Sequence, residues 1–200
     1  MKERKAPNMP QIFDKIGRDK VRTQLLDTGF ELIKQYGLKK TSVSAIAKKS
    51  GIATGTFYNF FPSKEEFVYQ LVLYKRQTVK EAFDELVADG KADKERFRIF
   101  LRKLYFEDND VFQYLSEDEI DLLRARWKEE YWKNEQNDER TSKWVLECLT
   151  GLKEDVNWKV FANFTKSISL IRHGKDKLYK EAYEETINIL IGSILNYLFE

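Results

Sequence analysis

The stretch Ser50–Phe67, which reads SGIATGTFYNFFPSKEEF, places four aromatic residues within five positions. Glycines and threonines precede these aromatic residues, and Pro-Ser-Lys-Glu-Glu follows them. In a helix that buries one face, apolar residues recur every three or four positions. Neighbouring aromatic residues therefore cannot all enter one core. We expect a very short helix over 54–60, with one side packed and the other side in contact with another molecule.

Helical patterns flank this stretch on both sides. Apolar residues that recur at steps of three to five predict a helix over 19–36. Thr41 is a suitable N-cap for a short second helix, and Gly51 can take the turn conformation that follows it. Ser63–Glu66 has the pattern of a capping box. We therefore predict a longer helix that starts there and runs to about residue 88.

The remainder of the chain also has helical spacing, without the alternation that is typical of strands. A second capping-box pattern stands at Ser116–Glu119, and the last two predicted helices cover about 157–173 and 176–199. These two helices are too apolar for a single buried face each, so pairing with their copies in a second subunit would form a four-helix interface. The alternative is that the extra apolar surface covers the chain's own core. The residues expected at the dimer interface are Phe161, Ile168, Ile187, Ile191, Ile194 and Leu195.

Charge is distributed unevenly along the 200 residues. Residues 1–64 carry 13 lysines and arginines against 5 acidic residues, whereas residues 65–200 carry 22 against 28, within a net charge of +2. A basic first third indicates that this part of the chain meets a polyanion. No apolar run approaches the roughly 20 residues that span a bilayer, and the N-terminus lacks a signal-type apolar segment. We expect a cytoplasmic protein without a membrane partner.

Residues 41–60 have the architecture of a helix-turn-helix, in which the second helix enters the DNA major groove and the first crosses the backbone. Hydroxyl groups and lysines suit phosphates, a glycine lets the backbone come close, and Asn59 can read a base edge. We predict DNA contacts from Thr41, Lys48, Thr54, Gly55, Thr56, Tyr58, Asn59 and Lys64.

The run Thr41–Phe67, TSVSAIAKKSGIATGTFYNFFPSKEEF, resembles the N-terminal domain of the TetR/AcrR family of transcription regulators. The matching elements include Gly51-Ile52, Gly55-Thr56, Tyr58 and Ser63-Lys64-Glu65. The close match covers about residues 19–70. The resemblance implies three helices for DNA, a fourth as connector, and a helical body that binds a ligand and dimerises. It also implies a homodimer, usually a repressor, that leaves its DNA when a small molecule binds.

The resemblance sets the expected organisation: a basic arm at 1–18, a helix-turn-helix domain at 19–66, and a ligand-binding and dimerisation domain at 67–200. A hydrophobic or aromatic ligand of unknown identity is expected in the body, and the operator is expected to be a palindromic DNA duplex. The residues expected to line the ligand site are Tyr105, Trp127, Tyr131, Trp144 and Phe164.

Two positions depart from the family pattern. Family members often have Ser where Ala53 stands, and a serine there would cap the second helix of the helix-turn-helix, which reads the DNA. They often have His or Tyr where Phe60 stands, as a phosphate contact. These departures leave open an alternative: a helical adaptor that binds a protein partner and has lost specific DNA reading.

An enzyme on a helical scaffold is the remaining alternative, and the sequence gives little support to it. The chain has one histidine and one cysteine, and it has no phosphate-binding loop and no metal-ligand spacing. We therefore expect no enzymatic activity, no cofactor and no metal.

Overall fold

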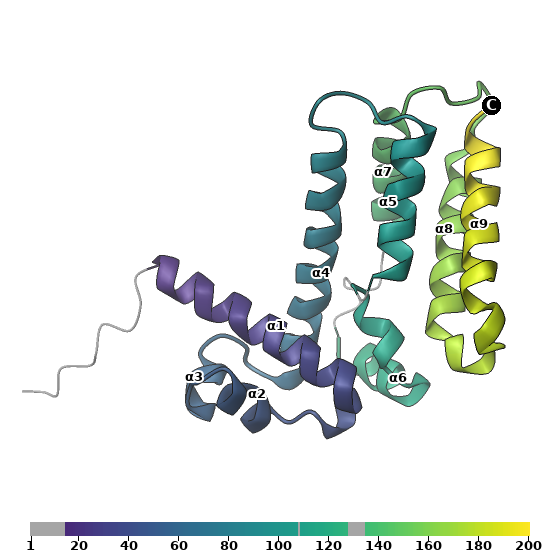
Figure 1. Ribbon diagram of the computed structural model, residues 1–200. Helices are drawn as coiled ribbons and strands as arrows, with labels where there is room; N and C mark the ends of the chain where they lie inside the picture. The colour runs from purple at the N-terminus through teal and green to yellow at the C-terminus, as the bar shows by residue number, and fades with distance from the viewer. Residues whose placement is uncertain (1–14, 108, 128–134) are drawn as a thin grey trace, which may run out of the picture. The chain divides into compact units, whose positions relative to one another are not determined.

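A computed structural model describes residues 15–107, 109–127 and 135–200 of the chain (Figure 1). Within these ranges every regular element is a helix, and two isolated bridges, Ala92 with Leu149 and Leu152 with Phe199, tie loops together. The prediction of an all-α protein is confirmed. The chain divides into two compact units, with the division between Gln70 and Leu71 inside one long helix.

The first unit begins with α1 (Lys15–Lys40), which is interrupted at Gly37. Gly37 has φ 77° and ψ 165°, a backbone conformation that favours glycine because other residues would strain their side chains. Two short helices follow, α2 (Val43–Lys49) and α3 (Thr54–Tyr58), and α4 (Lys64–Leu86) begins in this unit. The predicted helix-turn-helix order is therefore present.

Three phenylalanine rings form the centre of the first unit. Phe57, Phe61 and Phe67 are fully buried, and their ring centroids lie 5.1 to 5.4 Å apart. Gly29 on α1 makes room for them, since a methyl group at this position would lie 2.2 Å from Phe67 Cζ. Aliphatic residues complete this core; they are Leu25, Leu26, Ile33, Ile46, Ala47 and Val68.

The described residues of the second unit form the rest of α4 and five further α-helices. They are α5 (Lys94–Phe106), α6 (Glu117–Arg126), α7 (Glu135–Glu147), α8 (Trp158–His173) and α9 (Tyr183–Leu198). The 3-10 helix η1 (Val111–Tyr114) lies between α5 and α6. Ser116 and Glu119 form the predicted capping box, in which each side chain bonds the other residue's backbone N–H. Within this unit α9 packs against α5 and α8, and α8 packs against α7 (Figure 1).

Some predicted helix bounds are wrong. Apolar spacing indicates a helix only from Trp144, after a polar segment, but α7 already begins at Glu135. The last helix was expected from about residue 176, whereas two 3-10 turns, Lys175–Lys177 and Lys180–Ala182, precede α9. The first residues of α7 are polar, so apolar periodicity does not reveal the start of this helix.

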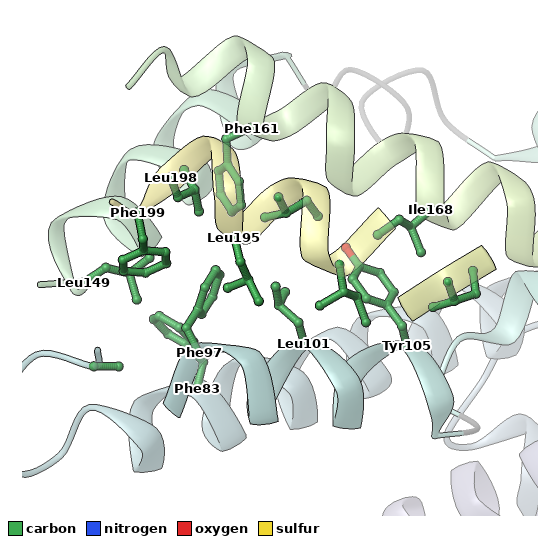
Figure 2. Packing of buried hydrophobic residues seen from close by; sticks show 14 residues of the cluster. Phe83, Phe97, Leu101, Tyr105, Leu149, Phe161, Ile168, Leu195, Leu198 and Phe199 are labelled. Atoms are coloured by element: carbon green, nitrogen blue, oxygen red, sulfur yellow. The ribbon is translucent and has the colours of Figure 1, made fainter. Parts of the chain in front are cut away.

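The predicted dimer-interface residues require a correction. All six lie in one core cluster together with Phe97, Leu101 and Tyr105 of α5 (Figure 2); they are Phe161, Ile168, Ile187, Ile191, Ile194 and Leu195. Each is buried within the chain itself. They cover the chain's own core, so they cannot form the outer surface that meets a second subunit.

Candidate nucleic-acid interface

The two short helices of the first unit are joined by a tight turn at Gly51, where φ is 71°. The N-cap of α2 is Ser42, whose hydroxyl accepts a hydrogen bond from the Ala45 N–H at 3.1 Å. Thr41 was predicted to be this cap, and this prediction is wrong; its predicted contact with DNA stays a prediction. Its side chain is buried at 1% exposure, and its hydroxyl donates to the Gly37 carbonyl at 2.8 Å. Thr41 therefore stabilises the interrupted end of α1.

Helix α3 has one buried residue and a largely exposed polar face. Phe57 enters the core, whereas the predicted residues Thr54, Gly55 and Tyr58 are exposed and Thr56 is half-buried. The Tyr58 side chain is 50% exposed and its ring meets Phe57 edge-on at 5.6 Å. The core contact fixes the ring and leaves the other side of the helix available for a ligand as large as a DNA duplex.

The N-terminus of α3 has no side-chain cap. Ala53 occupies the cap position with an extended backbone, φ −70° and ψ 147°, and its methyl group accepts no hydrogen bond. Thr54 is the first residue of the helix, so it does not replace the cap. The backbone bond from the Thr56 N–H to the Ala53 carbonyl, 2.9 Å, closes the first turn.

Exposed lysines accompany this face at two helix ends. Lys39 and Lys40 lie in the last turn of α1, and Lys48 and Lys49 lie in the last turn of α2. Lys64 is placed differently from its prediction as a DNA contact: it is half-buried, and its ammonium donates to the Leu38 carbonyl at 2.6 Å. The lysines of α1 and α2 supply positive charge at the surface, whereas Lys64 also joins the start of α4 to the end of α1.

Arg18 and Phe60 form a contact that sequence reasoning missed. The Arg18 guanidinium lies 5.4 Å from the centroid of the Phe60 ring, and its Nη2 donates to the Asn59 carbonyl at 3.1 Å. Arg18 and Asn59 are both exposed. The contact therefore fixes an exposed guanidinium beside the C-terminal end of α3. No local pattern could reveal it, because about forty residues separate the partners.

Other basic residues of the N-terminal region have different placements. Arg22 donates to Gln70 Oε1 at 2.7 Å and lies 5.7 Å from the Phe61 ring, so it joins α1 to α4 inside the unit. Lys2, Arg4 and Lys5 of the predicted arm lie outside the described residues.

The N-terminal part of the chain matches the family model described as bacterial regulatory proteins of the tetR family, over residues 25–71. The transcriptional repressor KstR2 of Rhodococcus jostii is 27% identical over 147 residues, which are 72% of each chain. The fatty acid metabolism regulator protein of Bacillus subtilis is 31% identical over 80 residues, so the chain matches only 41% of that protein's length.

Solved structures share the fold of the whole chain. A TetR family regulator from Marinobacter aquaeolei has a TM-score of 0.60 at 20% identity, covering 92% of this chain and 98% of its own. The N-terminal part of the chain thus matches the TetR family, and the chain shares the fold of TetR-family regulators. A fatty acid degradation regulator, FadR from Bacillus halodurans, has a TM-score of 0.59 at 16% identity, covering 97% of this chain and 95% of its own. The chain is a DNA-binding transcription regulator, and α2 and α3 are its helix-turn-helix.

Of the residues predicted to line the ligand site, Tyr105 and Trp127 lie near the end of α8, whereas Trp144 and Phe164 have other neighbours. Trp144 meets Phe83 edge-on at 4.9 Å, and Phe164 meets Tyr197 at 5.8 Å. Tyr105 is buried in the core of α5, α8 and α9, and Trp127 meets Phe112 at 6.4 Å. Tyr131 lies outside the described residues.

The described part of the chain has neither a metal-binding cluster nor a membrane-spanning helix. Its histidine, cysteine, aspartate and glutamate side chains form no group of three that could hold a metal ion. None of its helices is long and apolar enough to cross a membrane.

Proposed function

We propose that this chain is a homodimeric repressor that binds a palindromic operator and is released from it by a small hydrophobic or aromatic molecule. The observation that carries the DNA-binding part is the exposed polar face of α3, accompanied by the lysines of α1 and α2. In a helix-turn-helix protein this second helix reads the major groove, and surrounding cations bind phosphates. The alternative of an adaptor that has lost DNA reading has no supporting observation.

The ligand class draws support from the relatives. KstR2 of Rhodococcus jostii is named a repressor, and the proteins from Bacillus subtilis and Bacillus halodurans are named for fatty acid metabolism and degradation. The second unit of this chain is rich in aromatic side chains, among them Phe83, Phe97, Tyr105 and Trp144. An apolar ligand would contact such side chains only where the core opens to admit it.

Release follows from dimer geometry. Two reading helices engage successive major grooves only when they are separated by roughly 34–36 Å, one helical turn of DNA. A ligand that binds more tightly to a dimer with another separation must weaken DNA binding, because the coupling between two sites is reciprocal. Helix α4 begins in the first unit and continues in the second, so it is the covalent path for such coupling.

Fluorescence anisotropy with the DNA directly upstream of the chain's own gene tests the DNA-binding part. The variants are Tyr58→Phe, which removes one hydroxyl, and Lys48→Gln, which removes one charge. We expect both to weaken specific binding, and Lys48→Gln to lower the slope of log affinity against log salt by about 1. Lys91→Gln is the matched control, since Lys91 is an exposed lysine of the second unit.

Specific binding that Lys91→Gln leaves intact and the other two variants weaken would support the assignment. Binding to scrambled DNA of equal strength, or variants that bind as the natural chain does, would contradict it.

A further inference from the structure

A group of buried polar side chains lies in the second unit where α5 and α8 both end. Arg172, in the last turn of α8, is only 3% exposed. Its Nη2 donates to the Glu107 carbonyl at 3.0 Å, and its guanidinium lies 5.9 Å from the Tyr105 ring. Tyr105 stands at the opposite end of the core cluster from Phe199 (Figure 2). A full positive charge is therefore held between a backbone carbonyl and an aromatic ring.

The Asp110 carboxylate, whose charge interacts with Arg172, is already engaged by other groups. Asp110 Oδ2 lies 2.8 Å from His173 Nε2, and Asp110 Oδ1 accepts from the Phe112 N–H at 3.0 Å. Burial tends to raise the pKa of Asp110, but the hydrogen bond and charge of His173, the Phe112 N–H and the charge of Arg172 together lower it below its usual value. Asp110 therefore stays ionised and acts on Arg172 through its charge, without a hydrogen bond among those that the structure records.

Two buried donors in this region have no acceptor within the described residues: Arg172 Nε and the side-chain amide nitrogen of Gln113. Gln113 belongs to η1, which packs against α8. A buried donor without an acceptor destabilises the folded chain, and the effect is larger when the donor is charged. A buried guanidinium with an unused N–H is thus a site that an incoming acceptor would stabilise.

Aromatic side chains surround the same place. Phe112 lies 5.9 Å from the His173 ring and 6.4 Å from the Trp127 ring. Tyr183, at the start of α9, is half-buried; burial raises the pKa of its hydroxyl, and the nearby Arg172 charge acts in the opposite direction. The His173 and Asp110 side chains, 28% and 22% exposed, connect the group to solvent. Tyr105 and Trp127, two residues expected from sequence to line a ligand site, are both in this region.

We propose that Arg172 binds the carboxylate of an organic acid whose apolar body contacts these aromatic side chains. The planar guanidinium matches a carboxylate in geometry and charge, and such bonds strengthen where water is excluded. The proposal rests on the proposed function, since it assigns a chemical class to the ligand of the second unit. Under this proposal, a neutral molecule of the same shape is not the preferred ligand.

Two matched pairs of probes test the proposal: decanoate against decan-1-ol, and 4-phenylbutyrate against 4-phenylbutan-1-ol. Binding to the DNA-free protein is measured by isothermal titration and by the shift of the melting temperature. We expect at least one acid to bind and its alcohol to bind more weakly by about 10- to 100-fold, the range for a hydrogen bond to a charged group. Arg172→Gln should remove this preference, and Arg172→Lys should keep part of it.

Arg102→Gln is the matched control, because Arg102 is an exposed arginine of the same unit. It should retain the preference for the acid. Helical circular dichroism and operator binding without probe show that each variant is folded. If Arg172→Gln does not fold, the comparison of Arg172→Lys with Arg102→Gln decides the question.

Equal binding of acid and alcohol, no binding of either acid, or an unchanged preference in the Arg172 variants would overturn the proposal. The effect of a bound acid on operator affinity is measured separately. If the acid binds through Arg172 and the operator affinity does not change, the carboxylate site stands and ligand-induced release is the part that fails.

Discussion

Phe60 contacts Arg18 at a position where the family often has a residue that binds phosphate. The family often has His or Tyr at this position, and a phenyl ring can make no hydrogen bond to phosphate. In this chain the ring instead contacts the Arg18 guanidinium, which also donates to the Asn59 carbonyl. A guanidinium has five donor N–H groups, so Arg18 can bind a phosphate while it keeps both contacts. The contact would restore at Arg18 the phosphate bond that Phe60 cannot make.

If Phe60 positions Arg18 for a phosphate, the effects of the two residues on DNA binding should be coupled. Arg18→Gln should weaken operator binding and lower the salt slope by about 1, as for the loss of one phosphate contact. Phe60→Leu should weaken binding about two- to fivefold, since an exposed cation–π contact contributes about 0.5–1 kcal/mol. In the Arg18→Gln background Phe60→Leu should have no further effect, and anisotropy at several salt concentrations measures all three variants.

Arg76→Gln, at an exposed arginine of the second unit, controls for general loss of charge and should leave the salt slope unchanged. Melting temperatures separate a DNA contact from a loss of stability. If the losses for Arg18→Gln and Phe60→Leu simply add, Phe60 does not position Arg18.

At the scale of an element, α3 is held by its core residue rather than by its ends. The helix has five residues, and no side-chain oxygen accepts from its first N–H groups. Isolated helices of this length are unstable in water. The buried Phe57 ring packs against Phe61 and Phe67. This packing therefore stabilises α3, whereas in a capped helix the N-cap would provide part of the stability.

Adding the missing cap should stabilise α3. Ala53 has the extended backbone that an N-cap requires, and a serine hydroxyl there can accept from the N–H of Gly55 or Thr56. Ala53→Ser should slow hydrogen exchange of the peptide that covers residues 53–61 by about two- to tenfold. An N-cap contributes about 0.5–2 kcal/mol, and only part of this free energy stabilises α3 locally. Hydrogen exchange followed by mass spectrometry gives the local value.

Ala88→Ser is the control, because it makes the same substitution at an exposed alanine of the second unit. It should leave hydrogen exchange of the peptide that covers residues 53–61 unchanged. Faster or unchanged exchange in Ala53→Ser would show that this end of α3 is already satisfied.

Elements with local signals could be predicted from sequence, and elements without them could not. The Ser116–Glu119 capping box and the helix that starts after Ser63 depend on neighbouring residues, and both are present. The choice between Thr41 and Ser42 as N-cap depends on the bend at Gly37, which buries the Thr41 side chain. The pairing of Arg18 with Phe60 depends on tertiary packing, and no local pattern encodes it.

At the scale of the whole molecule, apolar periodicity shows that a helix face is buried but not what covers it. The stripes of α8 and α9 that were expected to face a second subunit face α5 of the same chain (Figure 2). The apolar residues that remain outside are different ones. Leu170 on α8 is 71% exposed and Ile189 on α9 is 62% exposed. A dimer through these helices must therefore use the outward residues.

Charge at these outward positions should separate the subunits. Each chain has a mass of 23.8 kDa, and the natural protein should elute at twice that mass in size exclusion with light scattering. Leu170→Glu combined with Ile189→Glu should elute as the single chain, because buried unpaired carboxylates would cost more than the interface gains. Operator affinity should fall by more than about tenfold, since one chain engages only one half-site.

Ile99→Glu is the control that makes this result specific. Ile99 lies on α5 and is 59% exposed, close to the exposure of Ile189, so it carries the same substitution at a similar surface position. It should remain at twice the chain mass and keep its operator affinity. If the double variant also keeps both, the subunits meet through another surface, and the separation of the reading helices is not set by α8 and α9. If Ile99→Glu alone dissociates the protein, α5 forms the interface and the coupling from ligand to DNA must be sought along that helix.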